Sequence, residues 1–172
     1  MSSHNLQWIN SASRDEFVRV IGPVFEHSQW IARKAWEARP FAGVESLHQA
    51  LAQVVQASGE EKQLALIRAH PDLVGRAALT GTLTPESNRE QASAGLGSLT
   101  PEEIAAFESK NRAYRERFGF PFIICARLNK KEAILKGFDE RLQNTRAKEI
   151  AIALQEIGKI AQLRLNDLVA DG

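Results

Sequence analysis

The sequence predicts an all-α protein, a single-domain bundle of about eight helices. Apolar residues recur at helical spacing through most of the chain, and several of these stretches begin with a capping signal. No stretch alternates polar and apolar residues with the period of two that is typical of a half-buried strand. Because 172 residues suffice for one continuous core, we expect a single domain over residues 1–172.

Capping signals and the ends of apolar periodicity define the individual helices. Ser13 and Glu16 form a capping box, in which the serine oxygen accepts a backbone N–H and the glutamate reaches back. Further N-cap signals are Thr84, Thr100, Asn129 and Thr145. The predicted helices span residues 13–22, 26–38, 44–57, 60–69, 87–94, 100–118, 129–142 and 145–165.

Two segments depart from this helical pattern. Between His70 and Thr100 the periodicity is lost and several glycines intervene, so we expect a loop-rich active-site segment around residues 70–100. Phe120 to Ala126 is an apolar, strand-like run, but its neighbours in sequence offer no partner strand.

Composition and charge exclude several classes of function. Lys and Arg number 22 against 21 Asp and Glu, so no overall positive field favours nucleic acid, and we expect no nucleic-acid partner. The single cysteine, Cys125, excludes an intrachain disulfide and is predicted to be a small buried hydrophobe. We find no signal-peptide pattern, membrane-length apolar run or peroxisomal tripeptide, and therefore expect a cytoplasmic protein without a membrane partner.

Two sequence features bear the residue types of acid–base chemistry. His70 precedes Pro71 at the end of a predicted helix; it is either a helix-end residue that interacts with the helix dipole or a proton-transfer group. Ser87, Glu90 and Gln91 share one helix face, so they can converge on a ligand, although serine and glutamate near a helix start also serve as caps. These residues point to a site for a small molecule.

Two further features can be interpreted as either structural or functional. The aromatic run from Phe118 to Ile123, broken by Gly119 and Pro121, forms either part of the core or a stiff pocket wall. Arg164 either lays its stem along the surface of the last helix or points inward, where it needs an anion or a planar acceptor. The four histidines are scattered without metal-ligand spacing, and phosphate or dinucleotide glycine motifs are absent, so we expect no metal and no cofactor.

Four segments in register resemble the OHCU (2-oxo-4-hydroxy-4-carboxy-5-ureidoimidazoline) decarboxylase family. They are His70-Pro71-Asp72-Leu73, the pattern Ser-x-x-Glu-Gln-x-x-Ala-Gly-Leu from Ser87, the run Phe118 to Ile123, and the closing helix Glu149 to Leu165. The resemblance implies an all-α enzyme without a cofactor that acts in purine metabolism. Its expected reaction is the last step of urate degradation to (S)-allantoin.

The resemblance also implies roles for individual residues. His70 and Glu90 are the expected catalytic residues, with His70 as the proton-transfer group. The expected substrate-binding residues are Pro71, Ser87, Asn88, Arg89, Gln91, Phe122, Ile123, Ile124, Cys125, Ala126 and Arg164.

Two alternatives to a decarboxylase remain open at this stage. One is a non-catalytic helical module that binds a ureide or purine metabolite, and the other is a hydrolase in which Glu90 or His70 activates water. Relatives of the family suggest a homodimer, for which the sequence shows no interface signature.

Overall fold

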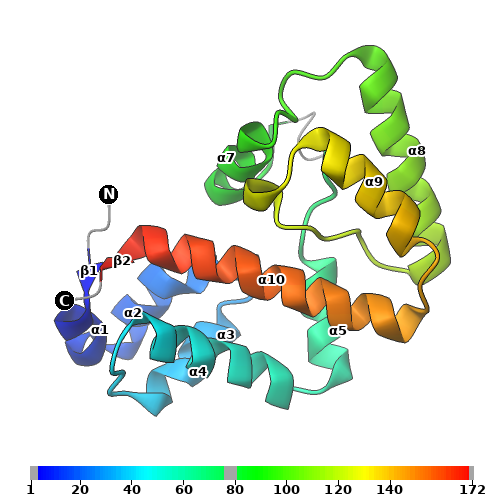
Figure 1. The fold of residues 1–172 in the computed structure, drawn as a ribbon. Helices are drawn as coiled ribbons and strands as arrows, with labels where there is room; N and C mark the ends of the chain where they lie inside the picture. Colours follow the sequence, from blue (N-terminus) through cyan, green and yellow to red (C-terminus); the bar gives the residue numbers. More distant parts are fainter. Residues whose placement is uncertain (1–3, 76–80, 171–172) are drawn as a thin grey trace. The chain divides into compact units, whose positions relative to one another are not determined.

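A computed structural model describes residues 4–75 and 81–170 and confirms the all-α fold class (Figure 1). The contacts divide the chain into two compact units, which we describe separately. Unit 1 comprises the chain up to Ala69 together with residues from Gly158 onward, and unit 2 runs from His70 to Ile157. The long helix α10 (Arg146–Leu168) contributes its first half to unit 2 and its second half to unit 1.

Unit 1 is built mainly from short helices around an apolar core. Its elements are β1 (His4–Asn5), α1 (Leu6–Ser11), α2 (Arg14–Ile21), η1 (Gly22–Val24), α3 (Trp30–Ala35), η2 (Trp36–Ala38), α4 (Val44–Ala57), α5 (Glu60–Arg68), the end of α10 and β2 (Val169–Ala170). Phe17 on α2, Ile31 on α3 and Leu47 on α4 are completely buried, as amphipathic helices require. β1 and β2 pair in parallel, with His4 opposite Val169, which the sequence did not predict.

The predicted helix from Glu26 to Ala38 is wrong at its start. The structure has a 3₁₀ turn at Gly22–Val24, and α3 begins only at Trp30. His27 has a positive φ of 47°, a left-handed conformation that a continuous right-handed helix excludes. Pro23 and His27 together therefore delay the helix by one turn.

Unit 2 holds the candidate site residues other than Arg164. Its elements are α7 (Pro85–Ser93), α8 (Pro101–Phe118), η3 (Ala126–Leu128), α9 (Lys131–Arg141) and the first half of α10. Tyr114 lies in an aromatic cluster, with ring centroids 4.6 Å from Phe118 and 5.3 Å from Phe122. Such ring pairs stabilise the core beyond simple burial.

The capping predictions are confirmed at most helix starts. Ser13 forms a complete capping box with Glu16, and so does Thr100 with Glu103. Asn129 was the wrong cap, because Lys130 is the N-cap of α9 and the Asn129 amide donates to the Cys125 carbonyl instead. The side chain thus fastens the preceding segment rather than the helix.

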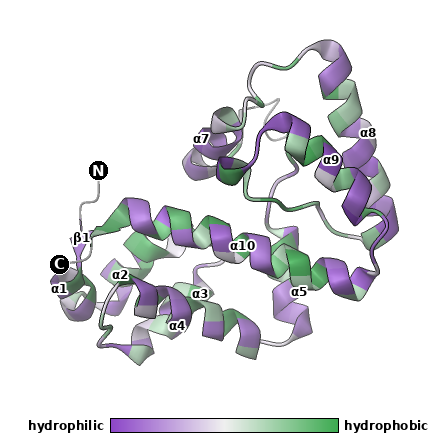
Figure 2. Cartoon of the chain, in the orientation of Figure 1, coloured by the Kyte–Doolittle hydropathy of each residue, from purple (hydrophilic) through white to green (hydrophobic). Residues whose placement is uncertain are grey.

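Helical periodicity is visible along the surface of α10, where hydrophilic and hydrophobic residues alternate (Figure 2). The run Phe120 to Cys125 forms neither a helix nor a strand and has no strand partner in the described part of the chain. Over these same ranges, no helix combines the length and apolar character needed to cross a bilayer.

Candidate active site

The candidate catalytic histidine lies at the start of the loop that follows α5. His70 follows the C-terminus of α5 and is buried, with 7% of its surface exposed, while Pro71 is half-buried. Leu73 and Val74 are also buried. A loop with this burial needs partners for its backbone polar groups, and two helices of unit 2 provide them.

Gln91 on α7 binds this loop through both ends of its amide. Its Oε1 accepts the Val74 N–H at 3.1 Å, and its Nε2 donates to the Asp72 carbonyl at 3.4 Å. Gln91 is itself buried, at 6% exposure. The pair of hydrogen bonds brings α7, with Ser87 and Glu90, to the segment that bears His70.

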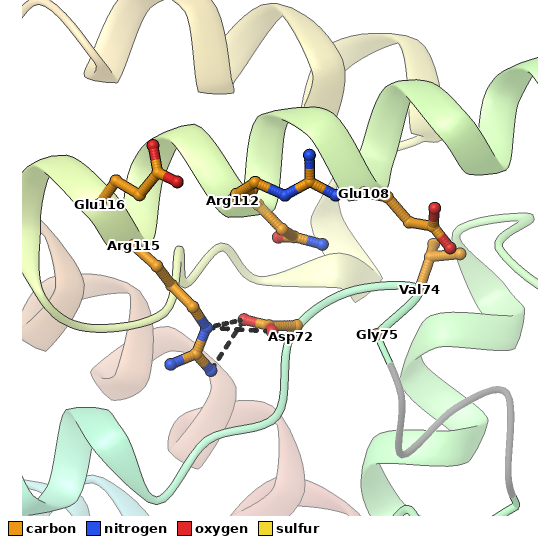
Figure 3. A pocket seen from close by; sticks show the side chains of 8 residues that line it. Asp72, Val74, Gly75, Glu108, Arg112, Arg115 and Glu116 are labelled. Atoms are coloured by element: carbon orange, nitrogen blue, oxygen red, sulfur yellow. Dashed lines mark hydrogen bonds and ion pairs between the residues drawn. The ribbon is translucent and has the colours of Figure 1, made fainter.

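Two residues of α8 hold the same loop. Asn111 Nδ2 donates to the Leu73 carbonyl at 2.8 Å. The Arg115 guanidinium binds the Asp72 carboxylate, with Nε 3.1 Å from both carboxylate oxygens, and Figure 3 shows the two groups turned toward each other. Neither Asn111 nor Arg115 was predicted to have this role, although Asn111 is a polar residue on a helix face that is otherwise apolar.

A hollow of about 420 Å³ lies beside this part of the loop (Figure 3). Its lining residues are Asp72, Val74, Gly75, Glu108, Asn111, Arg112, Arg115 and Glu116. His70, Ser87 and Glu90 do not line it, so we do not assign this hollow to the candidate catalytic residues. It marks instead the side of the loop that faces α8.

The backbone of this loop is strained at Val74. Val74 has a φ of 54°, which for a β-branched residue costs on the order of 1–3 kcal/mol. The hydrogen bond from its N–H to Gln91 helps to offset this cost. At Gly75 a Cβ would lie only 2.6 Å from the Asp72 Cβ, so the close approach of the chain to itself requires glycine.

We expect Gly75→Ala to loosen the loop. Relief of the 2.6 Å contact must shift the backbone next to Asp72, with an expected loss of about 1–3 kcal/mol in the free energy of unfolding. Urea denaturation measures this loss. Gly97→Ala is the matched control, because nothing lies within 4 Å of the Cβ it would add; equal stability of the two variants would contradict the assigned packing.

Helix α7 presents only part of its predicted site to the interior. Thr84 caps the helix by accepting the Ser87 N–H at 3.2 Å. Ser87 is buried, at 5% exposure, and Glu90 is half-buried. Asn88 and Arg89, between them on the helix, are exposed. The motif therefore divides into inward and outward positions, as the helical period requires.

The backbone of the predicted pocket wall is fixed by side chains from two helices. Arg141 Nη1 on α9 donates to the Ile123 carbonyl at 2.5 Å, and Glu156 Oε1 on α10 accepts the Cys125 N–H at 3.0 Å. Phe122, Ile123, Cys125 and Ala126 are buried, and Ile124 is half-buried. The rings of Phe118 and Phe122 lie in the aromatic cluster around Tyr114.

Cys125 connects the wall to α7. Burial raises the pKa of its thiol, and the negative charges of Glu156 and Glu90 raise it further. Helix α7, which bears Glu90, packs against η3, the turn that begins immediately after Cys125. A thiol with a raised pKa stays protonated at neutral pH, which agrees with its predicted role as a buried hydrophobe.

A buried carboxylate organises the elements behind the wall. Glu149 is fully buried and accepts hydrogen bonds from Tyr114 Oη at 2.6 Å, Arg141 Nε at 2.7 Å and Asn144 Nδ2 at 2.8 Å. Burial, followed by this hydrogen bond to Glu149, raises the pKa of Tyr114. The network fixes Arg141, which in turn holds Ile123.

In unit 1, Arg164 points inward and does not lie along the surface of α10. The side chain is buried, at 5% exposure. Its Nη2 lies 2.8 Å from Glu26 Oε1, and its Nη1 donates to the Pro23 carbonyl at 3.1 Å. A buried guanidinium needs such an anion, and the side chain of Glu26 provides one.

The described residues contain no group of three or more His, Cys, Asp or Glu side chains that would hold a metal ion. They do combine a buried loop histidine with a helix that bears serine, glutamate and glutamine. These are residue types of general acid–base chemistry, and in an all-α fold they define a candidate site of the small-molecule acid–base class.

Comparison with known proteins gives the particular family. The model of the family described as OHCU decarboxylase matches residues 10–166. A 2-oxo-4-hydroxy-4-carboxy-5-ureidoimidazoline decarboxylase from Halalkalicoccus jeotgali is 40% identical over 168 residues, covering 98% of this chain and 93% of that protein. Its namesake from Amia calva is 42% identical over 165 residues, covering 96% of this chain and 94% of that protein.

A solved structure agrees with these matches. The crystal structure of (S)-allantoin synthase superposes with a TM-score of 0.77 at 28% identity and covers 98% of this chain. The chain spans 54% of the length of that solved chain, or about half. The protein belongs to the OHCU decarboxylase family, which makes it an enzyme of the decarboxylase class, a carbon–carbon lyase. The resemblance stated from the sequence motifs is confirmed.

Proposed function

We propose that the protein converts 2-oxo-4-hydroxy-4-carboxy-5-ureidoimidazoline into (S)-allantoin and CO₂ without a cofactor. The observation that carries the proposal is the match to relatives of that name at 40% and 42% identity over nearly the whole chain. The reaction would be the last step from urate to allantoin. The substrate is accordingly a small molecule.

His70 and Glu90 are the proposed catalytic residues. Loss of CO₂ breaks a carbon–carbon bond, and the electron pair of that bond passes into the adjacent ring system. A proton must then reach one face of the ring to give a single enantiomer. His70 is suited to move this proton, since it is buried three residues from a hydrogen-bonded backbone carbonyl and imidazole is the usual acid–base group near neutral pH. Glu90 would orient the imidazole or the ureido group.

Substrate binding is proposed for the residues of the family motifs. Ser87, Asn88, Arg89 and Gln91 form the set on α7, of which Ser87 and Gln91 are buried and the other two exposed. Pro71 and the wall from Phe122 to Ala126 complete the set in unit 2. An apolar wall beside the leaving carboxylate would favour its departure as neutral CO₂.

Arg164 is proposed to bind the ring or ureido oxygens rather than the carboxylate that leaves. An arginine on that carboxylate would stabilise the ground state and slow the reaction, whereas negative charge accumulates on the ring oxygens. A ligand complex in which Arg164 clamps the reacting carboxylate would overturn this assignment.

A circular-dichroism time course on freshly generated substrate tests the proposal. Wild-type protein should produce the optical signal of (S)-allantoin well above the rate measured without protein, with release of CO₂. Racemic allantoin, formed at the rate measured without protein, would contradict the proposed decarboxylase activity. It would favour a non-catalytic binding module. Turnover without CO₂ would favour a hydrolase instead.

A cytoplasmic location and a homodimeric assembly belong to this proposal as expectations from the sequence. Light scattering coupled to size exclusion measures the assembly directly. A mass near the 19.1 kDa of one chain would contradict the dimer.

A further inference from the structure

One polar side chain interrupts the buried face of α8. The buried residues of this helix are Phe107, Asn111, Tyr114 and Phe118. Asn111 is 6% exposed, and its Oδ1 has no hydrogen-bond partner among the residues that the structure describes. Burial of an amide with one end unpaired is unfavourable, so the position calls for an explanation.

We propose that Asn111 is a positioning residue for the reaction: its hydrogen bond to Leu73 fixes the loop that bears His70. The inference rests on the proposed role of His70 in proton transfer. Asn111 itself does not touch the reacting atoms. It acts through the backbone, since its Nδ2 donates to the Leu73 carbonyl at 2.8 Å.

The connection from Asn111 to the imidazole is short and conformationally restricted, because it runs through the Leu73 carbonyl and the backbone back to His70. Leu73 is only three residues from His70, and Pro71 between them has a fixed φ. The neighbouring residues of the loop are held as well, Asp72 by Arg115 and Val74 by Gln91. A catalytic group must be held to within a fraction of an ångström, and attachment at successive residues provides that constraint.

Packing alone does not account for an asparagine at this position. Leucine has the same branched shape and would remove the unpaired buried Oδ1. Its methyl groups are larger than the amide, and the hollow that Asn111 lines gives them room. What asparagine adds is the N–H donor to Leu73. Its contribution should therefore appear in turnover more than in stability.

The experiment compares Asn111→Leu with Phe107→Leu, a buried substitution one turn earlier on α8 that has no bond to the loop. For Asn111→Leu we expect a Tm within about 3 °C of wild type, because loss of the hydrogen bond and loss of the unpaired oxygen offset each other. We expect kcat to fall at least about tenfold and KM to stay within about threefold. Phe107→Leu should lower Tm and leave kcat at 25 °C near wild type.

Two outcomes would overturn the proposal. One is an unchanged kcat in Asn111→Leu, and the other is a fall in kcat and Tm that merely matches Phe107→Leu. Should Asn111→Leu fail to fold, Arg115→Gln tests the same loop from an exposed position. Its loss of the Asp72 ion pair should lower kcat about fivefold, and an unchanged kcat there would overturn the loop attachment.

Hydrogen exchange separates this proposal from the proposed function. The Val74 N–H, bonded to Gln91, should exchange faster in Asn111→Leu than in wild type or Phe107→Leu. An inactive wild-type protein would refute the decarboxylase, while the exchange rate of Val74 would still decide the attachment. An unchanged exchange rate of the Val74 N–H would refute the attachment of the loop by Asn111.

Discussion

His70→Asn should lower kcat at least about a hundredfold while the fold stays intact. A single general acid–base group typically contributes ~10²–10⁴-fold, and asparagine retains hydrogen-bonding capacity without a group that titrates near neutral pH. The expected product is allantoin at the background rate and without enantiomeric excess. Steady-state kinetics by circular dichroism measure both quantities, and thermal unfolding verifies the fold.

His27→Asn is the matched control for this substitution. The His27 side chain is 69% exposed, and its φ of 47° suits asparagine, which tolerates left-handed backbone better than most residues. We expect wild-type kcat from this variant. If His70→Asn instead lost stability and kept its kcat, His70 would be a helix-end residue without a catalytic role.

Glu149→Gln should cause the largest loss of stability. The carboxylate accepts three hydrogen bonds, two of them buried, from Tyr114 and Arg141, and a part-buried one from Asn144. An amide can accept through only one atom, and it leaves the buried Arg141 guanidinium without its counter-charge. Breaking a buried pair in this way costs about 3–5 kcal/mol in the free energy of unfolding. Because Arg141 also holds the Ile123 carbonyl, we expect the pocket wall to loosen too.

Urea denaturation measures this loss as a lower midpoint at an unchanged m-value. Glu140→Gln is the control, since Glu140 pairs with Lys136 at 3.6 Å while both side chains are mostly exposed. Such a pair is worth about 0–1 kcal/mol. Similar midpoints for the two variants would show that the Glu149 network contributes little to stability.

Local signals were enough to predict most helices. The prediction for residues 44–57 coincides with α4 (Val44–Ala57), and the Thr100 signal gives the start of α8 at Pro101. These features depend on contacts between residues up to four positions apart. The prediction at Glu26 was wrong because the left-handed backbone of His27 has no clear signal in the residue types around it.

The candidate site was predicted as a set of residues but not as an arrangement. Motif resemblance implied catalytic roles for His70 and Glu90, and helical spacing placed Ser87, Glu90 and Gln91 on one helix face. It did not show that the Gln91 amide binds the loop beside His70, 17 residues away along the chain. Asn111 and Arg115 were missed, because their partners lie 38 and 43 residues away.

The sequence by itself determined the all-α class, most helix boundaries and the family, and it supplied the candidate residues of the site. These follow from helical periodicity, capping and motifs, which are properties of neighbouring residues. Only the tertiary structure decided that Arg164 is buried against Glu26, that Glu149 gathers three donors, and that the His70 loop is held from two helices. The physical reason is that a buried polar group must find a partner wherever the folded chain brings one, and sequence spacing does not determine which residue that is.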